Sequence, residues 1–178
     1  MPGLKLELGG KELGKGEVVG RDSLSPLVSI IAVKAHIAND DYSEAQSPPT
    51  LAFKSSNANP TAYLAICIDL DAPYKTIPFL GPILHWLQPS LKADSDSTLR
   101  AQSEELVSWA PPGPPPGAAP HRYVFVLYEQ REDLSVAELQ KQYPKPLSVA
   151  KRMRWNLESF EKTVGLGEKV AAAWFESS

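Results

Sequence analysis

Five titratable side chains lie within apolar runs of this chain or at their ends. Two carboxylates follow the run 63–68, one histidine lies within the run 79–87, and a histidine and a tyrosine open the run 121–128: Asp69, Asp71, His85, His121 and Tyr123. Side chains alternate along a strand, so Asp69 and Asp71 are expected on one face. The same alternation places His121 and Tyr123 together. Protonated imidazole and a phenol hydroxyl donate to phosphate oxygens, while carboxylates accept from an ammonium group or hold a histidine tautomer. The combination predicts a site for an anion with an attached cation.

A proline-rich loop, residues 111–117, comes shortly before the run 121–128. Proline fixes φ, and the glycines Gly113 and Gly117 permit backbone angles that other residues resist. With Pro115 between them, the loop is expected to keep its shape without regular secondary structure and to form one wall of the site. A polyproline ligand for an aromatic groove is the alternative. The two glycines argue against it, because they interrupt a regular polyproline helix.

Each candidate residue also has a purely structural interpretation. Asp69 and Asp71 could cap a turn, and His85 could be a satisfied core histidine. Asp, His and Tyr are general acid–base types, but the sequence holds no Gly-x-Ser-x-Gly motif and its histidines lack compact metal-ligand spacing. Cys67 lies inside an apolar run, as expected for a buried, inert thiol. Catalysis is therefore the weaker hypothesis, and no metal or cofactor is expected.

The elements that must position these residues are mostly short strands. Strands are expected at residues 28–37, 49–53, 63–70, 83–87, 106–109, 122–128 and 170–175. A helix is expected at 135–142, where Ser135 and Glu138 form a capping box. A second helical region, 148–164, is expected in two pieces, with Asn156 as an N-cap and Gly165 at its end. Residues 92–105 are expected to be a surface loop. Many short strands followed by helices predict a mainly β fold, a β-sandwich with peripheral helices toward the C-terminus.

Composition narrows the class of protein. The chain has 178 residues, a formal net charge of −3 and one cysteine. We expect a single domain, 1–178, in which residues 1–25 form a weakly structured lead-in. Charges of both signs are mixed, which indicates neither a nucleic-acid partner nor a polybasic membrane patch. One cysteine is typical of a reducing compartment, and no run has the length of a membrane span or the form of a signal peptide. The expectation is a cytoplasmic protein without stable membrane insertion.

Three motifs carry a resemblance to a known family. They are Asp-Leu-Asp-Ala-Pro at 69–73, His-Trp-Leu at 85–87, and the segment from Gly113 through the proline loop to Tyr123. In order and spacing they resemble the signature of the phosphatidylethanolamine-binding protein family. Gly81-Pro82 and His85-Trp86 look closest to its fungal branch, and the segment 156–175 resembles plant and fungal members. Leu80 and Leu84 depart from the pattern, since the family commonly carries a tyrosine and a histidine there.

The resemblance implies two antiparallel sheets with Greek-key connections and a pocket at one end of the larger sheet. It also implies a cis peptide bond at Ala72–Pro73, and a second at Gly81–Pro82. The ligand-binding residues that it implies are Asp69, Asp71, His85, Gly113, Pro115, His121 and Tyr123.

The function implied is that of a non-enzymatic regulatory protein that binds phosphate or a phospholipid headgroup and modulates signalling proteins. The family includes the Raf kinase inhibitor protein of animals, flowering-time regulators of plants and a yeast inhibitor of vacuolar carboxypeptidase. The implied protein partners are therefore a protein kinase, a small-GTPase regulator or a serine carboxypeptidase. Carboxypeptidase inhibition is the alternative function, although residues 1–25 do not visibly match the N-terminal segment that the yeast-type inhibitor uses.

Overall fold

The fold was analysed in a computed structural model, which describes residues 4–8, 11–15, 35–37, 46–54, 62–167 and 169–177. The elements in chain order are β1 (Leu4–Leu8), β2 (Lys11–Lys15), β3 (Ala35–Ile37), β4 (Thr50–Phe53), β5 (Tyr63–Asp69), β6 (Ile83–Ala93), β7 (Leu99–Ala101), β8 (His121–Glu129), α1 (Val136–Gln142), α2 (Val149–Arg152), α3 (Leu157–Val164) and β9 (Lys169–Ser177). No helix in the described part of the chain is both long and apolar enough to cross a membrane.

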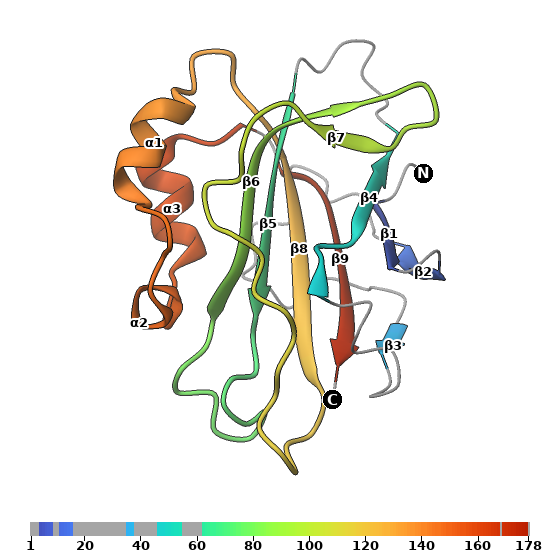
Figure 1. The fold of residues 1–178 in the computed structure, drawn as a ribbon, viewed down its shortest axis with the longest axis vertical. Coiled ribbons are helices and arrows are strands. Elements are labelled where there is room, and N and C mark those ends of the chain that lie inside the picture. Colours follow the sequence, from blue (N-terminus) through green and yellow to red (C-terminus); the bar gives the residue numbers. More distant parts are fainter. Residues whose placement is uncertain are drawn as a thin grey trace.

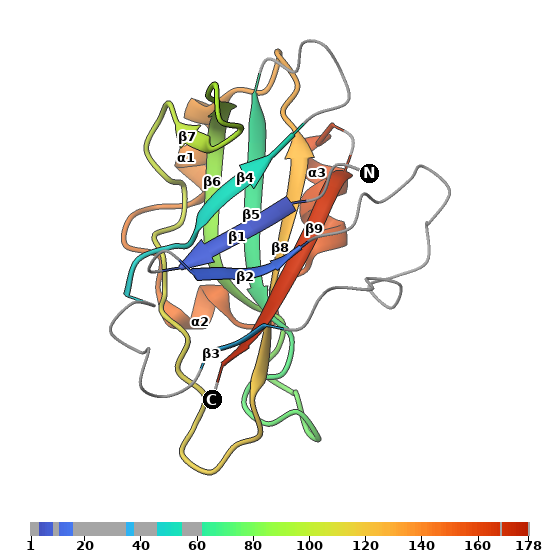
Figure 2. The ribbon, with the colours of Figure 1, turned by 90° about the vertical axis from the view of Figure 1, so that its right-hand side faces the viewer.

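A six-stranded sheet is the centre of the molecule, with the strand order β3-β9-β8-β5-β6-β7. Its pairs are antiparallel except β3–β9, which is parallel and so departs from the expected all-antiparallel pattern. A three-stranded sheet, β2-β1-β4, lies beside one face of the large sheet, and the helices lie beside the other (Figures 1 and 2).

Alternation along the central strands divides the core in two. Ala65, Cys67 and Phe125 point toward β4, where they pack in one cluster with Leu51 and Phe53. The intervening side chains of β5 and β8 point the other way and join residues of the helices, among them Leu139 and Phe160. Because β5 is buried on both faces, its sequence is continuously apolar rather than alternating.

The predicted mainly β fold with antiparallel pairing and late helices is confirmed. Ser135 caps α1 by accepting from the backbone N–H of Glu138, and Asn156 caps α3 by accepting from that of Ser159. Gly165 ends α3 in the left-handed conformation, with φ 63°. The predicted caps are confirmed, because a cap is decided by residues about three positions apart. Only the Ser135 half of the predicted capping box is seen, since the Glu138 carboxylate accepts from Lys141 Nζ at 2.6 Å.

Three local predictions were wrong. Residues 1–25 contain β1 and β2, and β1 pairs with β4; the alternating leucines of 4–8 are a strand pattern that the surrounding Gly and Lys residues obscured. Within 92–105, β6 continues to Ala93 and pairs with β7, while Asp94 accepts from the Thr98 N–H across the turn between the two strands. Residues 106–109 form only an isolated bridge, between Val107 and Leu87. Of the predicted strand 28–37, residues 28–34 lie outside the described part.

Candidate functional site

The His121 ring lies between two acceptors at one end of the large sheet. Its Nδ1 lies 2.9 Å from Oδ2 of Asp69, and its Nε2 lies 3.1 Å from the carbonyl oxygen of Pro73. Both residues are buried. The antiparallel register brings them together, because Asp69 of β5 faces Tyr123 of β8 and His121 is two residues away. A neutral ring has one N–H, so it donates to both acceptors only when it carries two protons.

Asp71 does not share a face with Asp69, contrary to the prediction from strand alternation. Strand β5 ends at Asp69 and the chain then bends, which turns the Asp71 carboxylate toward Arg122. Arg122 donates to it from its backbone N–H, at 2.9 Å, from Nε, at 2.9 Å, and from Nη2, at 2.7 Å. Burial favours the neutral acid, but these bonds and the charge of Arg122 outweigh it and hold the pKa of Asp71 below its ordinary value. Both carboxylate oxygens are thus engaged within the protein.

His85 reaches the site because of a β-bulge. Cys67 pairs with Trp86 and Ile68 pairs with Leu84, so His85 is the extra residue on β6. The bulge turns its ring toward Tyr123, with the ring centroids 5.0 Å apart and nearly perpendicular. Nδ1 lies 2.6 Å from the carbonyl oxygen of Ala110 and therefore carries a proton. Nε2 has no hydrogen-bond partner within the described residues. Burial lowers the pKa of His85, opposed by the Ala110 bond and the charge of Asp69.

The proline loop is attached to this group of side chains. The backbone N–H of Ala110 donates to the carbonyl oxygen of His85 at 2.9 Å, and that of Gly113 donates to the Tyr123 hydroxyl at 3.3 Å. Pro115 accepts from the Ala118 N–H in the turn at Gly117, whose φ of 78° requires glycine's freedom. A Cβ on Gly113 would meet no protein atom within 4 Å. Gly113 therefore has open space in front of it.

The structure thus brings together Asp69, His85, His121, Tyr123 and the loop that contains Gly113 and Pro115, while Asp71 is engaged by Arg122. The Ala72–Pro73 and Gly81–Pro82 peptide bonds, which the resemblance implied to be cis, are cis in the structure, and so is Lys145–Pro146.

Sequence reasoning missed two arginines that hold the site in place. Arg122 engages Asp71, and the buried Arg152 donates to the carbonyl oxygens of Leu84, His85 and Ser108 at 3.1, 3.2 and 2.8 Å. Lys151 and Arg154 flank Arg152 and are exposed. Nothing in the sequence distinguishes the buried member of this basic group from its exposed neighbours.

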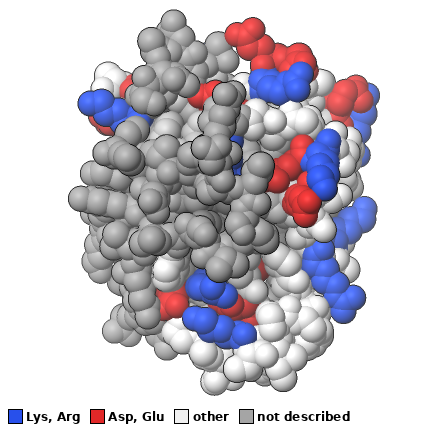
Figure 3. All heavy atoms as spheres, turned by 180° about the vertical axis from the view of Figure 1, so that it is seen from behind, with Lys and Arg blue, Asp and Glu red and all other residues white. Residues whose placement is uncertain are grey.

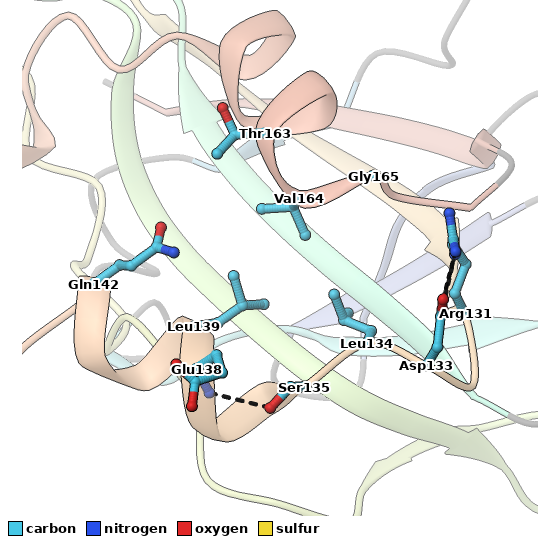
Figure 4. A pocket seen from close by; sticks show the side chains of 10 residues that line it. All are labelled: Arg131, Asp133, Leu134, Ser135, Glu138, Leu139, Gln142, Thr163, Val164 and Gly165. Atoms are coloured by element: carbon cyan, nitrogen blue, oxygen red, sulfur yellow. Dashed lines mark hydrogen bonds and ion pairs between the residues drawn. The ribbon is translucent and has the colours of Figure 1, made fainter.

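A separate cavity lies between α1 and α3, on the helical side of the large sheet (Figure 4). Its volume is about 240 Å³, and it is lined by Arg131, Asp133, Leu134, Ser135, Glu138, Leu139, Gln142, Thr163, Val164 and Gly165. None of the predicted site residues lines it. In the portion of the chain that the structure describes, no cluster of three or more His, Cys, Asp or Glu side chains could hold a metal ion.

The fold resembles solved structures along nearly the whole chain. A carboxypeptidase Y inhibitor complexed with its cognate proteinase matches with a TM-score of 0.65 at 19% identity, covering 98% of this chain and 82% of that one. A phosphatidylethanolamine-binding protein from Plasmodium vivax matches with a TM-score of 0.61 at 15% identity, covering 99% of this chain and 85% of that one.

Relatives of known name occur in fungi and plants. The phomoidride biosynthesis cluster protein N of Talaromyces stipitatus is 35% identical over an alignment of 124 residues that covers 64% of this chain and 57% of that protein. The rice protein MOTHER of FT and TFL1 homolog 2 is 30% identical over 167 residues, 91% of this chain and 87% of that protein. The chain thus spans less than two thirds of the first of these relatives. The family model of the phosphatidylethanolamine-binding protein matches residues 28–176. This chain belongs to the phosphatidylethanolamine-binding protein family.

Proposed function

We propose that this protein binds an anionic group, a phosphate or a phospholipid headgroup, at the end of the large sheet where the proline loop meets β5, β6 and β8. The observation that carries the proposal is the His85 ring. Its Nδ1 is committed to Ala110, and its Nε2 has no hydrogen-bond partner among the described residues, although the ring is buried. A ring nitrogen that makes no hydrogen bond to a described residue can donate to or accept from an atom of a ligand.

The neighbouring charges are compatible with an anion. A lone buried carboxylate would repel one, but Asp69 is paired with His121, and Asp71 is paired with Arg122. Each pair carries no net charge when both partners are ionised. The open space in front of Gly113 provides room for a group to approach the backbone of the proline loop.

Protonation of His85 is the expected accompaniment of binding. The neutral ring, protonated at Nδ1, presents a lone pair at Nε2; the imidazolium presents an N–H that can donate to a phosphate oxygen. Burial lowers the pKa of this ring, and a bound anion favours the charged form. Binding of an anion should therefore raise the pKa of His85 and take up a proton.

The proposed role is binding rather than reaction. Acyl or phosphoryl transfer needs an activated nucleophile. The single thiol, Cys67, is fully buried, and burial raises its pKa well above its ordinary value. The proposal includes Asp71, Pro115 and Tyr123 as residues that shape the site. It also includes the Greek-key connections of a two-sheet sandwich, which the resemblance implies. The proposed biological role is regulation of a signalling protein.

A second candidate is inhibition of a serine carboxypeptidase. The observation that favours it is the fold match to a carboxypeptidase Y inhibitor over 98% of this chain. Titrating the protein into a carboxypeptidase assay separates the two functions. Stoichiometric inhibition supports the second, and full protease activity at micromolar protein excludes it.

The direct test of the first function is calorimetric titration with sulfate, inorganic phosphate and phosphoethanolamine. We expect His85→Gln to weaken binding of all three by about 10- to 150-fold, because a charge-assisted hydrogen bond contributes about 1.5–3 kcal/mol. Arg131→Gln, in the separate cavity, is the matched control for nonspecific attraction and should change nothing. Anion binding that His85→Gln leaves unaltered would refute the proposed site.

A further inference from the structure

The turn formed by residues 73–80, here called the apolar turn, exposes three large hydrophobic side chains. The exposed fractions are 45% for Tyr74, 62% for Ile77 and 58% for Phe79. Scattered exposed hydrophobic residues are ordinary, but three within six residues form a contiguous apolar patch, which is typical of a site that contacts a partner or a membrane. Val149, on α2, is the other large hydrophobic residue this exposed in the described part of the chain, at 65%.

Several backbone groups of the apolar turn are satisfied by hydrogen bonds within the turn or to residues beside it. Ile77 N–H donates to Tyr74, Phe79 N–H donates to Ile77, and the N–H groups of Leu80 and Gly81 both donate to Ala72. Pro73 and Pro78 have no N–H. Arg154 also donates, through Nε, to the carbonyl oxygen of Phe79. A segment that enters an apolar environment needs such internal pairing, because an unsatisfied backbone group costs several kcal/mol in hydrocarbon.

The charges around the apolar turn are arranged with cations outward. In the pair Lys75–Glu176, the lysine side chain is 40% exposed and the glutamate 8%. In the pair Arg122–Asp71, the arginine side chain is 41% exposed and the aspartate 2%. Arg154 is exposed as well. Viewed from behind, the lower rim of the molecule is uncharged, and just above it Lys and Arg side chains lie together with Asp and Glu side chains (Figure 3). In both pairs the cation is therefore the partner that faces solvent, while its carboxylate is buried.

The apolar turn also adjoins the proposed anion site. The carbonyl oxygen of Pro73, at its start, accepts from His121 Nε2. Figure 1 shows this turn and the proline loop at the same end of the molecule, beyond the ends of β5 and β8. A surface that contacts the apolar turn would hence lie close to the residues proposed to hold the anion.

We propose that the apolar turn inserts into the interfacial layer of a lipid bilayer and that the protein takes its anionic ligand from that surface. Aromatic and aliphatic side chains surrounded by cations are the composition of interfacial membrane anchors. A convex turn with three apolar side chains cannot by itself supply the area of about 800 Å² per partner that a stable protein interface buries. The choice of ligand rests on the proposed function, whereas insertion of the turn rests on the observations above.

The test is co-sedimentation with vesicles of phosphatidylcholine, phosphatidylethanolamine and phosphatidylserine, using the full chain. The double variant Ile77→Ser/Phe79→Ser should weaken vesicle binding about tenfold or more, since burying each side chain stabilises the bound state by an amount of that order. Its sulfate affinity and its thermal unfolding should be unchanged, because both side chains are exposed. Val149→Ser removes an equally exposed apolar side chain outside the turn and should retain full vesicle binding.

The outcomes separate this inference from the proposed function. If the variant Ile77→Ser/Phe79→Ser binds vesicles as well as the wild type does, insertion of the turn is overturned. The same holds if the wild-type protein does not bind vesicles, or if Val149→Ser weakens vesicle binding as much as the double variant. If His85→Gln leaves sulfate binding intact while the double variant loses vesicle binding, the anion site fails and insertion of the turn stands. Self-association through the turn without vesicle binding would assign the patch to a protein contact and overturn the proposal.

Discussion

Arg152 Nη1 donates a hydrogen bond to the backbone carbonyl oxygen of His85, at 3.2 Å, on the bulge that turns the His85 ring toward Tyr123. The same nitrogen donates to Leu84, and Nη2 donates to Ser108, in the segment that leads to the proline loop. A buried cation therefore connects two segments far apart in the sequence through their carbonyl groups. Burial lowers the pKa of this guanidinium, which nonetheless remains protonated in the ordinary pH range.

Replacing Arg152 should destabilise the protein strongly. Arg152→Met removes the guanidinium hydrogen bonds to three carbonyl oxygens, those of Leu84, His85 and Ser108, which should lower the free energy of unfolding by about 3 kcal/mol. Urea unfolding measures this, and Lys151→Met, an exposed neighbour on α2, is the control. Arg152→Lys should recover part of the loss, and the His85 ring resonances should shift in its NMR spectrum. A change below about 0.5 kcal/mol for Arg152→Met would show that the bulge does not depend on this residue.

The Asp71–Arg122 pair should make the protein acid-sensitive. Because the pKa of Asp71 is lowered in the folded state, its contribution is complete above the ordinary value of 3.8 and is lost as pH falls through the folded value. Wild-type stability should accordingly fall more steeply than that of Asp71→Asn below pH 3.8, in urea unfolding at several pH values. Asp133→Asn removes a solvent-exposed pair with Arg131 and should leave the unfolding free energy unchanged. If the unfolding free energies of wild type and Asp71→Asn change with pH in parallel, the Asp71–Arg122 pair is not a source of acid sensitivity.

His85 should give the stability of the protein a second pH dependence, which a bound anion should reduce. Its folded pKa is lowered from 6.5, so its contribution to stability is complete above 6.5 and is lost as pH falls through the folded value. Saturating sulfate, whose charge is constant in this range, should reduce that loss by raising the pKa of the ring. Sulfate affinity should then fall by up to about tenfold per pH unit as pH rises from the lowered pKa of the free ring to the higher pKa of the bound ring, and should level off above that. Thermal unfolding and NMR titration of the His85 ring nitrogens measure both effects, and an identical ring titration with and without sulfate would exclude the coupling.

Two glycines should respond differently to the same substitution. A Cβ on Gly81 would lie 3.0 Å from the carbonyl oxygen of Leu70, which is backbone and cannot easily move, whereas a Cβ on Gly113 would meet nothing within 4 Å. Gly81→Ala should cost about 1–3 kcal/mol in unfolding free energy, and Gly113→Ala should leave stability nearly unchanged. If a ligand approaches the backbone at Gly113, Gly113→Ala should still weaken sulfate binding. Unaltered binding would remove Gly113 from the site.

Local sequence determined much of this protein. The caps at Ser135 and Asn156 and the apolar runs of β5 and β8 depend on residues a few positions apart, so they were predictable. The gathering of Asp69, His85, His121 and Tyr123 near one end of the sheet followed from their places in the apolar runs and from the family resemblance, and the structure puts them side by side. The strands β2 and β7 were missed because short polar strands are stabilised by their partners more than by their own composition, and β1 was missed because its alternating leucines lie among Gly and Lys residues.

Tertiary structure alone decided how the site residues point and which of them remain available. A one-residue bulge on β6 turns His85 toward Tyr123, and the bend after β5 directs Asp71 to Arg122 and away from the face of Asp69. Strand alternation has a period of two, so a single extra residue or an early strand end reverses a side chain. The burial of Arg152 and the outward cations of the apolar turn likewise depend on contacts between distant segments. Those contacts form only when the whole sheet is assembled, and no local pattern of residue types records them.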